Sequence, residues 1–468
     1  MKKIGEVLSV LRETFRGKCA GFICCIKDTK AVQFFLRRFS IAADHIYLAQ
    51  VLFLLLYRAV LDLVYIKWLS PVYAYSGFTT DLSWPLYLLS WALLLVFASF
   101  VAGLHADARP SSSLVLLVSY FYFVPLTSYC GCKGSSVSFL LCGAVYWGLL
   151  LFFQYVLPSI ELRPLALRHS RMLFSAVSVF SALLVLFVSG KYTHFRIFLN
   201  FIDVYGIRAE AAGYQMPRIL SYLLSFMTMT LAMSLLYWLQ RKKYAAVAGL
   251  LVVYLFYYSI AAHKSNFLFL ILLLGCYWFY RIWMRRYAAL FLSGGVLAVG
   301  LFSAVVSIIP MSVFLRRLMY IPLQISEVCE QFAAENPWNL FRYGIMGKLG
   351  FSPIYSESIP RVVGEFMGEA PTHANNGLLG DLFVNLPTAL GLILMPLLLV
   401  LCFRLLDMVS HGLPQKILIS FCVYYAVSFI NTSWSIVLLS HGFLFSCALL
   451  YVFPRKEISS YDLSSSHV

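Results

Sequence analysis

About twelve long apolar stretches, each close to the length of a membrane-spanning helix, divide this 468-residue chain. A helix needs roughly 20 mainly apolar residues to cross about 30 Å of hydrocarbon. The predicted spans are residues 46–66, 85–104, 113–129, 138–157, 172–190, 219–239, 244–262, 265–283, 287–307, 388–405, 416–431 and 435–453. The apolar runs are continuous rather than alternating, which favours helices over the strands of a membrane barrel. The sequence therefore predicts an all-α polytopic integral membrane protein.

The composition of the chain excludes a soluble globular fold. Hydrophobic residues make up 61% of the chain and charged residues 12%, and the mean hydropathy is +0.82. A soluble protein of this length needs more polar side chains than this to cover its surface. No cleavable signal peptide is visible at the N-terminus, because its only apolar run is short and lies between basic residues.

The net charge of +16 is explained by membrane topology rather than by nucleic-acid binding. The basic residues lie beside the predicted spans and form no single solvated block. With both termini in the cytoplasm, 23 of the 36 Lys and Arg residues lie inside, 12 lie outside and Arg58 lies within the first span. This distribution follows the positive-inside rule. We therefore expect no nucleic acid as a partner.

This topology divides the chain into five segments, with a cytoplasmic segment at each end. Residues 1–45 are basic, and their apolar residues recur at helical spacing, which predicts an amphipathic helix on the inner leaflet. An unstructured basic leader is the alternative. Spans one to nine occupy residues 46–307, a large outer loop occupies 308–387, and spans ten to twelve occupy 388–453. Residues 454–468 form the second cytoplasmic segment.

The outer loop 308–387 is far longer than the other connections. Loops of this length in compact proteins are usually functional. The stretch MSVFLRRLMYIPLQISEVCEQF (311–332) reads as an amphipathic helix, and ANNGLLGDLFVN (374–385) carries its own turn signals and apolar face. The sequence therefore predicts that this loop folds as a lid over the outer face of the bundle.

Five stretches after residue 200 combine aromatic, basic and amide residues in a distinctive order. They are FIDVYGIRAEA (201–211), AAHKSNFLFLILLL (261–274), FLRRLMYIPLQISEVCEQFAAENPW (314–338), HANNGLLGDLFVN (373–385) and FINTSWSIVLLSHG (429–442). In this order and with these loop lengths, the chain resembles the Wzy-type O-antigen and capsule repeat-unit polymerases of bacteria. The resemblance covers roughly residues 195–445. Some relatives carry, in both outer loops, an arginine that is followed eleven residues later by a glycine. This chain lacks that pattern, so no role is transferred to its arginines on that basis.

The resemblance implies an enzyme with a GT-C-like helical bundle in the bacterial inner membrane. Its substrate would be an oligosaccharide linked to undecaprenyl pyrophosphate, and the chain would pass to a sugar hydroxyl of the next lipid-linked repeat unit. The reaction would take place on the outer side of the membrane. Besides membrane lipids, the implied partners are a chain-length regulator and a flippase.

Such a reaction needs cations, because pyrophosphate departs as a strongly anionic leaving group. Guanidinium suits this task because its planar fork pairs with phosphate oxygens and stays protonated. The outer cations nearest to span ends are the candidate substrate-binding residues: Arg208, Arg218, Lys264, Arg316 and Arg317. The alternative interpretation of each of these residues is that it contacts only the phosphate groups of membrane lipids and not the substrate. The outer segments contain no cluster of acidic residues, so we expect no metal and no other cofactor.

The acceptor hydroxyl must also lose a proton, which requires a carboxylate or an imidazole. His373, Asp381 and Glu327 are the candidate catalytic residues, although His373 also reads as an ordinary loop histidine. Asn375, Asn376 and Asn385 are candidate substrate-binding amides in the same stretch. With Asn376 as N-cap, we expect Gly377, Asp381 and Asn385 to share one side of a short helix whose leucines cover the other side. A packing element whose polar stripe satisfies neighbouring backbone is the alternative.

Three other functions remain compatible with the sequence. An O-antigen ligase has the same architecture and a different acceptor. A lipid-linked oligosaccharide flippase would be expected to show two matched halves and charges that line cavities at mid-membrane depth. A structural scaffold of a polysaccharide export complex would not need the outer arginines. The pair Arg58 and Asp62, four residues apart in the first span, is interpreted as a structural ion pair.

Overall fold

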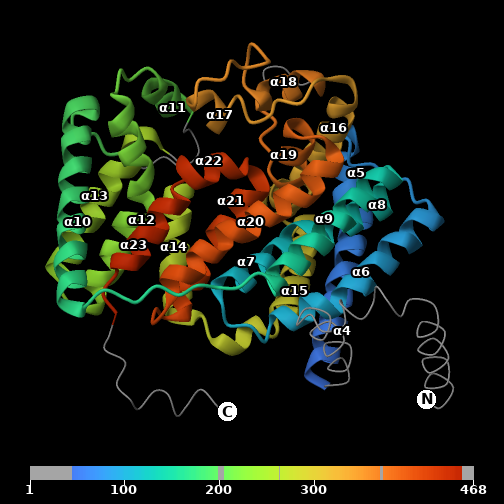
Figure 1. The fold of residues 1–468 in the computed structure, drawn as a ribbon, viewed down its shortest axis with the longest axis horizontal. Coiled ribbons are helices and arrows are strands. Elements are labelled where there is room, and N and C mark those ends of the chain that lie inside the picture. Colours follow the sequence, from blue (N-terminus) through green and yellow to red (C-terminus); the bar gives the residue numbers. More distant parts are fainter. Residues whose placement is uncertain (1–44, 199–204, 263, 369–372, 456–468) are drawn as a thin grey trace, which may run out of the picture.

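The computed structural model describes residues 45–198, 205–262, 264–368 and 373–455. These residues form helices and their connections, with no strand among them (Figure 1). The main helices of the bundle are α4 (His45–Val64), α6 (Trp84–Leu104), α7 (Pro110–Val118), α8 (Val124–Lys133), α9 (Val137–Val156), α10 (Leu167–Val188), α12 (Arg218–Gln240), α13 (Tyr244–Ala261), α14 (Lys264–Phe279), α15 (Ala288–Val305), α20 (Thr388–Ser410), α21 (Gln415–Asn431), α22 (Trp434–Leu439) and α23 (Phe443–Val452). The predicted amphipathic helix at the N-terminus lies outside the described residues.

Short helical turns extend or join the bundle helices. These are η1 (Tyr65–Leu69), α5 (Ser70–Tyr73), η2 (Ala74–Ser76), η3 (Ser119–Phe123), η4 (Ser189–Thr193) and η5 (Ile282–Arg285). The two long outer segments form further helices, namely α11 (Tyr205–Ala212), η6 (Met311–Tyr320), α16 (Ile321–Glu335), α17 (Ile345–Lys348), α18 (Ile359–Phe366) and α19 (Leu378–Asn385). The predicted amphipathic helix of residues 311–332 is thus observed as η6 and α16.

Ten helices in the described part of the chain are long and apolar enough to cross a membrane. The chain is therefore an all-α, multi-pass membrane protein. Each predicted span coincides with a helical region, but two of these are short: α14 has 16 residues and α21 has 17 residues. Both fall below the roughly 20 residues that a perpendicular span needs. The twelfth predicted span is divided, because Gly442 adopts φ 73° between α22 and α23.

The helices of the outer segments gather at one end of the bundle. Figure 1 shows α11, α16, α17 and α18 together at the top of the view. The connections predicted to face the cytoplasm contact one another through the pairs Gln415–Ala108, His411–Glu161 and Arg285–Leu104. These contacts bring four of the connections predicted to face the cytoplasm to one end of the bundle, while the number of spans and the membrane side of each end stay predictions.

The predicted ion pair in α4 is present and is enclosed by polar side chains of α6 and α8. Arg58 pairs with Asp62 one turn further along the helix. Its guanidinium also donates to the hydroxyl groups of Thr127 and Ser90, at 2.8 and 3.0 Å. Asp62 accepts a hydrogen bond from Ser128 at 2.6 Å. Because both charges are satisfied inside the bundle, these contacts support a structural role for the pair.

The topology can be tested by labelling single cysteines from outside the cell. Leu340, 41% exposed, belongs to the predicted outer loop, and Lys242 is exposed at a connection predicted to lie inside. We expect a membrane-impermeant maleimide to label Leu340→Cys in intact cells and to label Lys242→Cys only after the membrane is opened. The chain without an added cysteine is the control. The reverse pattern would refute the topology.

Candidate functional site

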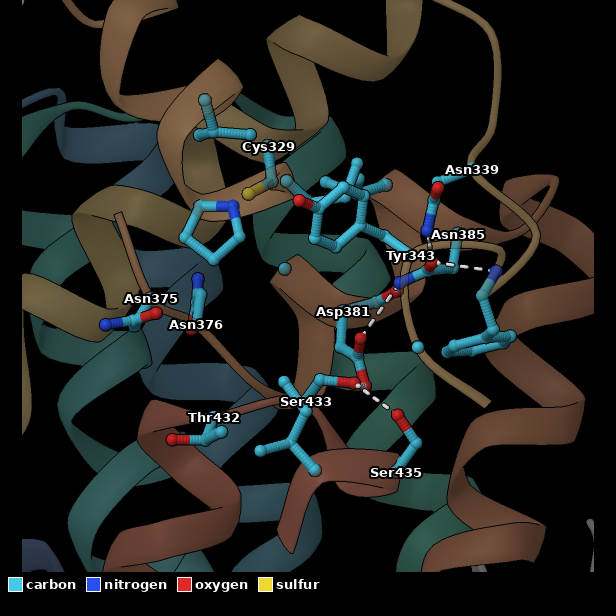
Figure 2. A pocket seen from close by; sticks show the side chains of 18 of the residues that line it. Cys329, Asn339, Tyr343, Asn375, Asn376, Asp381, Asn385, Thr432, Ser433 and Ser435 are labelled. Atoms are coloured by element: carbon cyan, nitrogen blue, oxygen red, sulfur yellow. Dashed lines mark hydrogen bonds between the residues drawn. The ribbon is translucent and has the colours of Figure 1, made fainter. Parts of the chain in front are cut away.

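A pocket with both polar and apolar walls lies where α19 meets the segment between α21 and α22 (Figure 2). The turn at residues 339–344 and the N-terminal end of α18 supply its other walls. It holds about 620 Å³ of empty space, counting its open mouth. Two of the helices that form it, α18 and α19, lie at the end of the bundle that carries the outer segments (Figure 1).

Gly377 determines how closely α19 approaches α21. Its backbone N–H donates to the carbonyl of Ile430 at 3.1 Å, and a Cβ atom at this position would clash with the carbonyl oxygen of Phe429. Gly377 is also the N-cap residue of α19, so the prediction that Asn376 caps this helix is wrong. The side chain of Asn376 instead accepts from the N–H of Gly377 and donates to Ser326 of α16, both at 2.8 Å.

The two sides of α19 are divided almost as the sequence predicts. Asp381 and Asn385 line the pocket together with Gly380 and Val384. The opposite side consists of buried core residues, Leu379, Leu382 and Phe383. Gly377 is not part of the pocket wall, because it is used in the contact with α21. The short helix therefore presents one polar side to the pocket and one apolar side to the bundle.

Asp381 is the acidic residue of the pocket wall and is 4% exposed. One carboxylate oxygen accepts from the amide of Asn385 at 2.9 Å. The other accepts from the hydroxyl of Ser433 and the backbone N–H of Trp434, both at 3.0 Å. Burial raises the pKa of Asp381 to about 6, while these three hydrogen bonds act in the opposite direction. None of the ion pairs formed by the described residues includes Asp381.

Asn385 connects Asp381 to the turn at residues 339–344. Its side-chain oxygen accepts from the amide of Asn339 at 2.8 Å and from the backbone N–H of Phe341 at 3.0 Å. Its amide nitrogen donates to the backbone carbonyl of Asp381 as well as to the carboxylate. Asn385 is 5% exposed, so these groups depend on one another for their hydrogen bonds. The other two predicted amides, Asn375 and Asn376, also line the pocket.

The polar segment from the end of α21 into the first turn of α22 supplies pocket residues that were not predicted. Thr432, Ser433 and Ser435 lie in the pocket wall, and Figure 2 shows Ser433 beside Asp381. The signal was present in the sequence as NTSWS (431–435), a polar run between two apolar stretches. Such runs inside a membrane segment are tolerated where they line a cavity or meet other protein groups. The sequence placed this segment at the junction of two predicted spans and within the family resemblance, but none of its residues was predicted to belong to the site.

The other two predicted acid–base candidates do not line this pocket. Glu327 lies on α16 and is 7% exposed. Its carboxylate accepts from the hydroxyl of Tyr129 at 2.8 Å and pairs with Lys133, both of α8. His373 is exposed at the surface of the outer segment. Among the three candidates, only Asp381 is therefore both buried and part of the pocket wall.

The neighbouring arginines of η6 have different environments. Arg316 is half-buried, and its guanidinium lies over the ring of Tyr73, 4.6 Å from the centroid. It also lies over the ring of Phe78 at 5.7 Å. Arg317 is exposed. These contacts indicate that Arg316 holds η6 against the turn after α5, whereas Arg317 is accessible to a ligand from outside.

The remaining predicted cations also lie outside the pocket wall. Arg208 is half-buried in α11, and Arg218 is exposed at the start of α12. Lys264 begins α14, but its side chain is not among the described ones. The pocket wall itself contains no lysine or arginine among the residues that the structure describes. Among the described residues, any cation that meets a ligand in this pocket must therefore come from outside its wall.

The pocket wall combines apolar side chains, such as Phe341, Val363 and Ile436, with polar groups that suit the hydroxyl groups of a neutral ligand. Its polar side chains are amides, hydroxyls and one carboxylate: Asn339, Asn375, Asn376, Asn385, Tyr343, Thr432, Ser433, Ser435 and Asp381. Amides and hydroxyls both donate and accept hydrogen bonds, as sugar hydroxyls do. The described part of the chain contains no group of three or more His, Cys, Asp or Glu residues placed to hold a metal ion. Comparison with protein-family models, with curated proteins and with solved structures gives no match to this chain.

Proposed function

We propose that this chain is a membrane glycosyltransferase that polymerises lipid-linked oligosaccharide repeat units of a bacterial surface polysaccharide, an O-antigen or a capsule. The proposal places it in the bacterial inner membrane with twelve spans, counting α14 and α21, and with both termini in the cytoplasm. The end of the bundle that carries α16, α18 and α19 would then face outward. The ordered resemblance between residues 195 and 445 supports this assignment, as does a sugar-compatible pocket at that end.

The observation that carries the proposal is the environment of Asp381. This carboxylate is buried beside amides and hydroxyls, is not ion-paired within the described residues, and has a pKa raised to about 6 by burial. A general base works best when its pKa is close to the working pH. In the proposed reaction, Asp381 accepts the proton of the acceptor hydroxyl, whose oxygen forms the new bond to the anomeric carbon.

The proposed leaving group needs positive charge rather than a base. As the new glycosidic bond forms, the bond between the anomeric carbon and the pyrophosphate oxygen breaks, and undecaprenyl pyrophosphate departs with the bonding electrons. Arg317 and Arg218 are exposed at this end of the bundle, and Arg208 lies in the other outer segment. We assign to them the neutralisation of the pyrophosphate, since guanidinium pairs with phosphate oxygens. The acceptor sugar occupies the pocket lined by Asn375, Asn376 and Asn385.

A deletion strain distinguishes this function from its rivals. Removal of the chain is expected to leave surface glycan that consists of single repeat units, because export and ligation continue while polymerisation stops. The full-length gene supplied from a plasmid should restore the ladder of longer chains. Complete loss of surface glycan would instead indicate a flippase or a ligase, and an unchanged ladder would refute a role in this pathway.

A further inference from the structure

A second cavity lies at the opposite end of the bundle, between α7, η3, η5, α15 and α21. In Figure 1 the yellow segment that contains η5 is at the bottom of the view, away from α18. The cavity holds about 710 Å³ of empty space, counting its mouth. Most of its wall is apolar, including Leu116, Leu117, Phe121, Leu292, Ile419 and Val423. Another wall residue, Phe291, is 52% exposed, so the groove opens to the outside of the bundle, a side that lipid covers in the predicted topology.

One charged side chain, Arg285, belongs to the wall of this groove. Arg285 is only 8% exposed, and one of its terminal nitrogens donates to the carbonyl of Leu104 at 2.8 Å. Its Nε is buried and has no hydrogen-bond partner. None of the ion pairs formed by the described residues includes Arg285. A buried guanidinium without a carboxylate is costly unless an anion compensates it.

No acidic group among the described residues forms an ion pair with Arg285, although the charge of Asp107 acts on it from nearby. Asp107, the acidic residue on the connection after α6, pairs with Arg109 at 2.6 Å. His105 contacts the hydroxyl of the groove residue Tyr120 at 2.8 Å. Burial, and then the positive charge of Arg285, lower the pKa of His105 to about 3, so this histidine is neutral at neutral pH. The polar end of the groove therefore carries a net positive charge.

We infer that this groove binds a membrane phospholipid, with an acyl chain along the apolar wall and the phosphate paired with Arg285. The apolar wall matches a hydrocarbon chain, and the uncompensated guanidinium matches a phosphate, with which it can form two hydrogen bonds at once. Basic pockets between membrane helices on the cytoplasmic side are suited to anionic headgroups. The predicted topology places this groove on that side. The inference is independent of the proposed enzymatic activity, because the groove and the pocket lined by Asp381 lie at opposite ends of the bundle.

The test measures lipid binding to the purified full-length protein in a neutral detergent. Phosphatidylglycerol is titrated, and the shift in apparent melting temperature is recorded together with lipid retained in native mass spectrometry. We expect phosphatidylglycerol to stabilise the unaltered protein and the Arg286→Ala variant, which loses an exposed charge one position away. Arg285→Gln keeps a donor for Leu104 but loses the charge, so its apparent affinity should fall roughly tenfold or more.

Two probes and one further variant test the contributions of the phosphate and of the acyl chains separately. Diacylglycerol, which lacks the phosphate, and glycerol 3-phosphate, which lacks the chains, should each stabilise the protein less than phosphatidylglycerol does. Ala288→Trp fills the groove while Arg285 stays in place, and it should also abolish retention of the lipid. Equal binding by Arg285→Gln or by Ala288→Trp would overturn the inference. A full shift with glycerol 3-phosphate would overturn it as well, because the site would then hold a soluble anion.

Discussion

Replacement of Asp381 by asparagine is expected to slow repeat-unit transfer by roughly 10²–10⁴-fold, the usual contribution of a positioned general base. Asparagine has nearly the same shape, and its side-chain oxygen can still accept from Ser433 and from the N–H of Trp434. Its amide nitrogen replaces the oxygen that accepts from Asn385, whose own amide keeps the backbone carbonyl of residue 381 as an acceptor. It cannot accept the proton of the acceptor hydroxyl. The variant should therefore reach normal levels in the membrane and fail in catalysis. The measurement is the rate of glycan elongation by purified protein, with the chain-length ladder in cells as a second readout.

The same experiment tests the structural alternative for Asp381. If this carboxylate only fastens α19 to the start of α22, the asparagine variant should elongate glycan at a nearly normal rate. Glu327→Gln is the matched control, since it removes another buried carboxylate, one that pairs with Lys133 and lies outside the pocket wall. We expect Glu327→Gln to lower protein stability more than the rate per folded molecule, because it leaves Lys133 without its partner. A larger loss of rate in the control than in Asp381→Asn would reject our assignment of the base.

The pH dependence of the rate follows from the raised pKa of Asp381. The charged carboxylate is the active form of a base, and burial raises its pKa to about 6. The rate should therefore be constant above this value and fall about tenfold per pH unit well below it. Ser433 donates a hydrogen bond that favours the charged form, so Ser433→Ala should shift the acid limb of the profile to higher pH. A purely structural role of Ser433 would lower the rate without moving that limb.

The spans were predictable from the sequence because the physics of the bilayer acts on each helix separately. Continuous apolar runs identify α6, α9 and α20 without any knowledge of their neighbours. The break between α22 and α23 was missed, since Gly442 lies in a run whose hydropathy is that of a single span. Hydropathy measures transfer into lipid, whereas such a break depends on packing at one position, here against Phe226.

The site was only partly predictable, because its residues come from separate parts of the chain. The polar side of α19, with Asp381 and Asn385, follows from helical spacing within a single stretch. Its partners Ser433 and Trp434 lie more than fifty residues further along, and no local pattern connects the two segments. The role of Gly377 was also missed, because the close approach of α21 that requires a glycine is a tertiary contact. Similarly, Arg316 and Arg317 are equivalent in the sequence, and only the rings around Arg316 distinguish them.

The second large effect is expected at the arginines that we assign to the departing pyrophosphate. Arg317→Ala and Arg208→Ala should each slow polymerisation by roughly 10²–10³-fold, as when one donor to a developing anion is removed. Lysine at either position should restore part of the rate, because it keeps the charge but loses the planar fork. The measurement is the chain-length distribution in cells at matched protein levels. Near-normal ladders for both alanine variants would show that Arg317 and Arg208 do not form a clamp on the pyrophosphate. They would then be contacts to the lipid surface.

The structure supplies a sharper control for this clamp than the sequence alone. Arg316 is adjacent to Arg317 and carries the same charge, but it stacks on Tyr73 and Phe78, so Arg316→Ala should reduce stability more than the rate. Arg208 lies on α11, which packs on α13, whereas Arg317 lies on η6, which packs on α15 and α16. If both nevertheless bind one pyrophosphate, their effects should not add, since the second substitution acts on a clamp already broken. Additive losses in the double variant would mean that the two arginines act at separate steps or on separate substrate molecules.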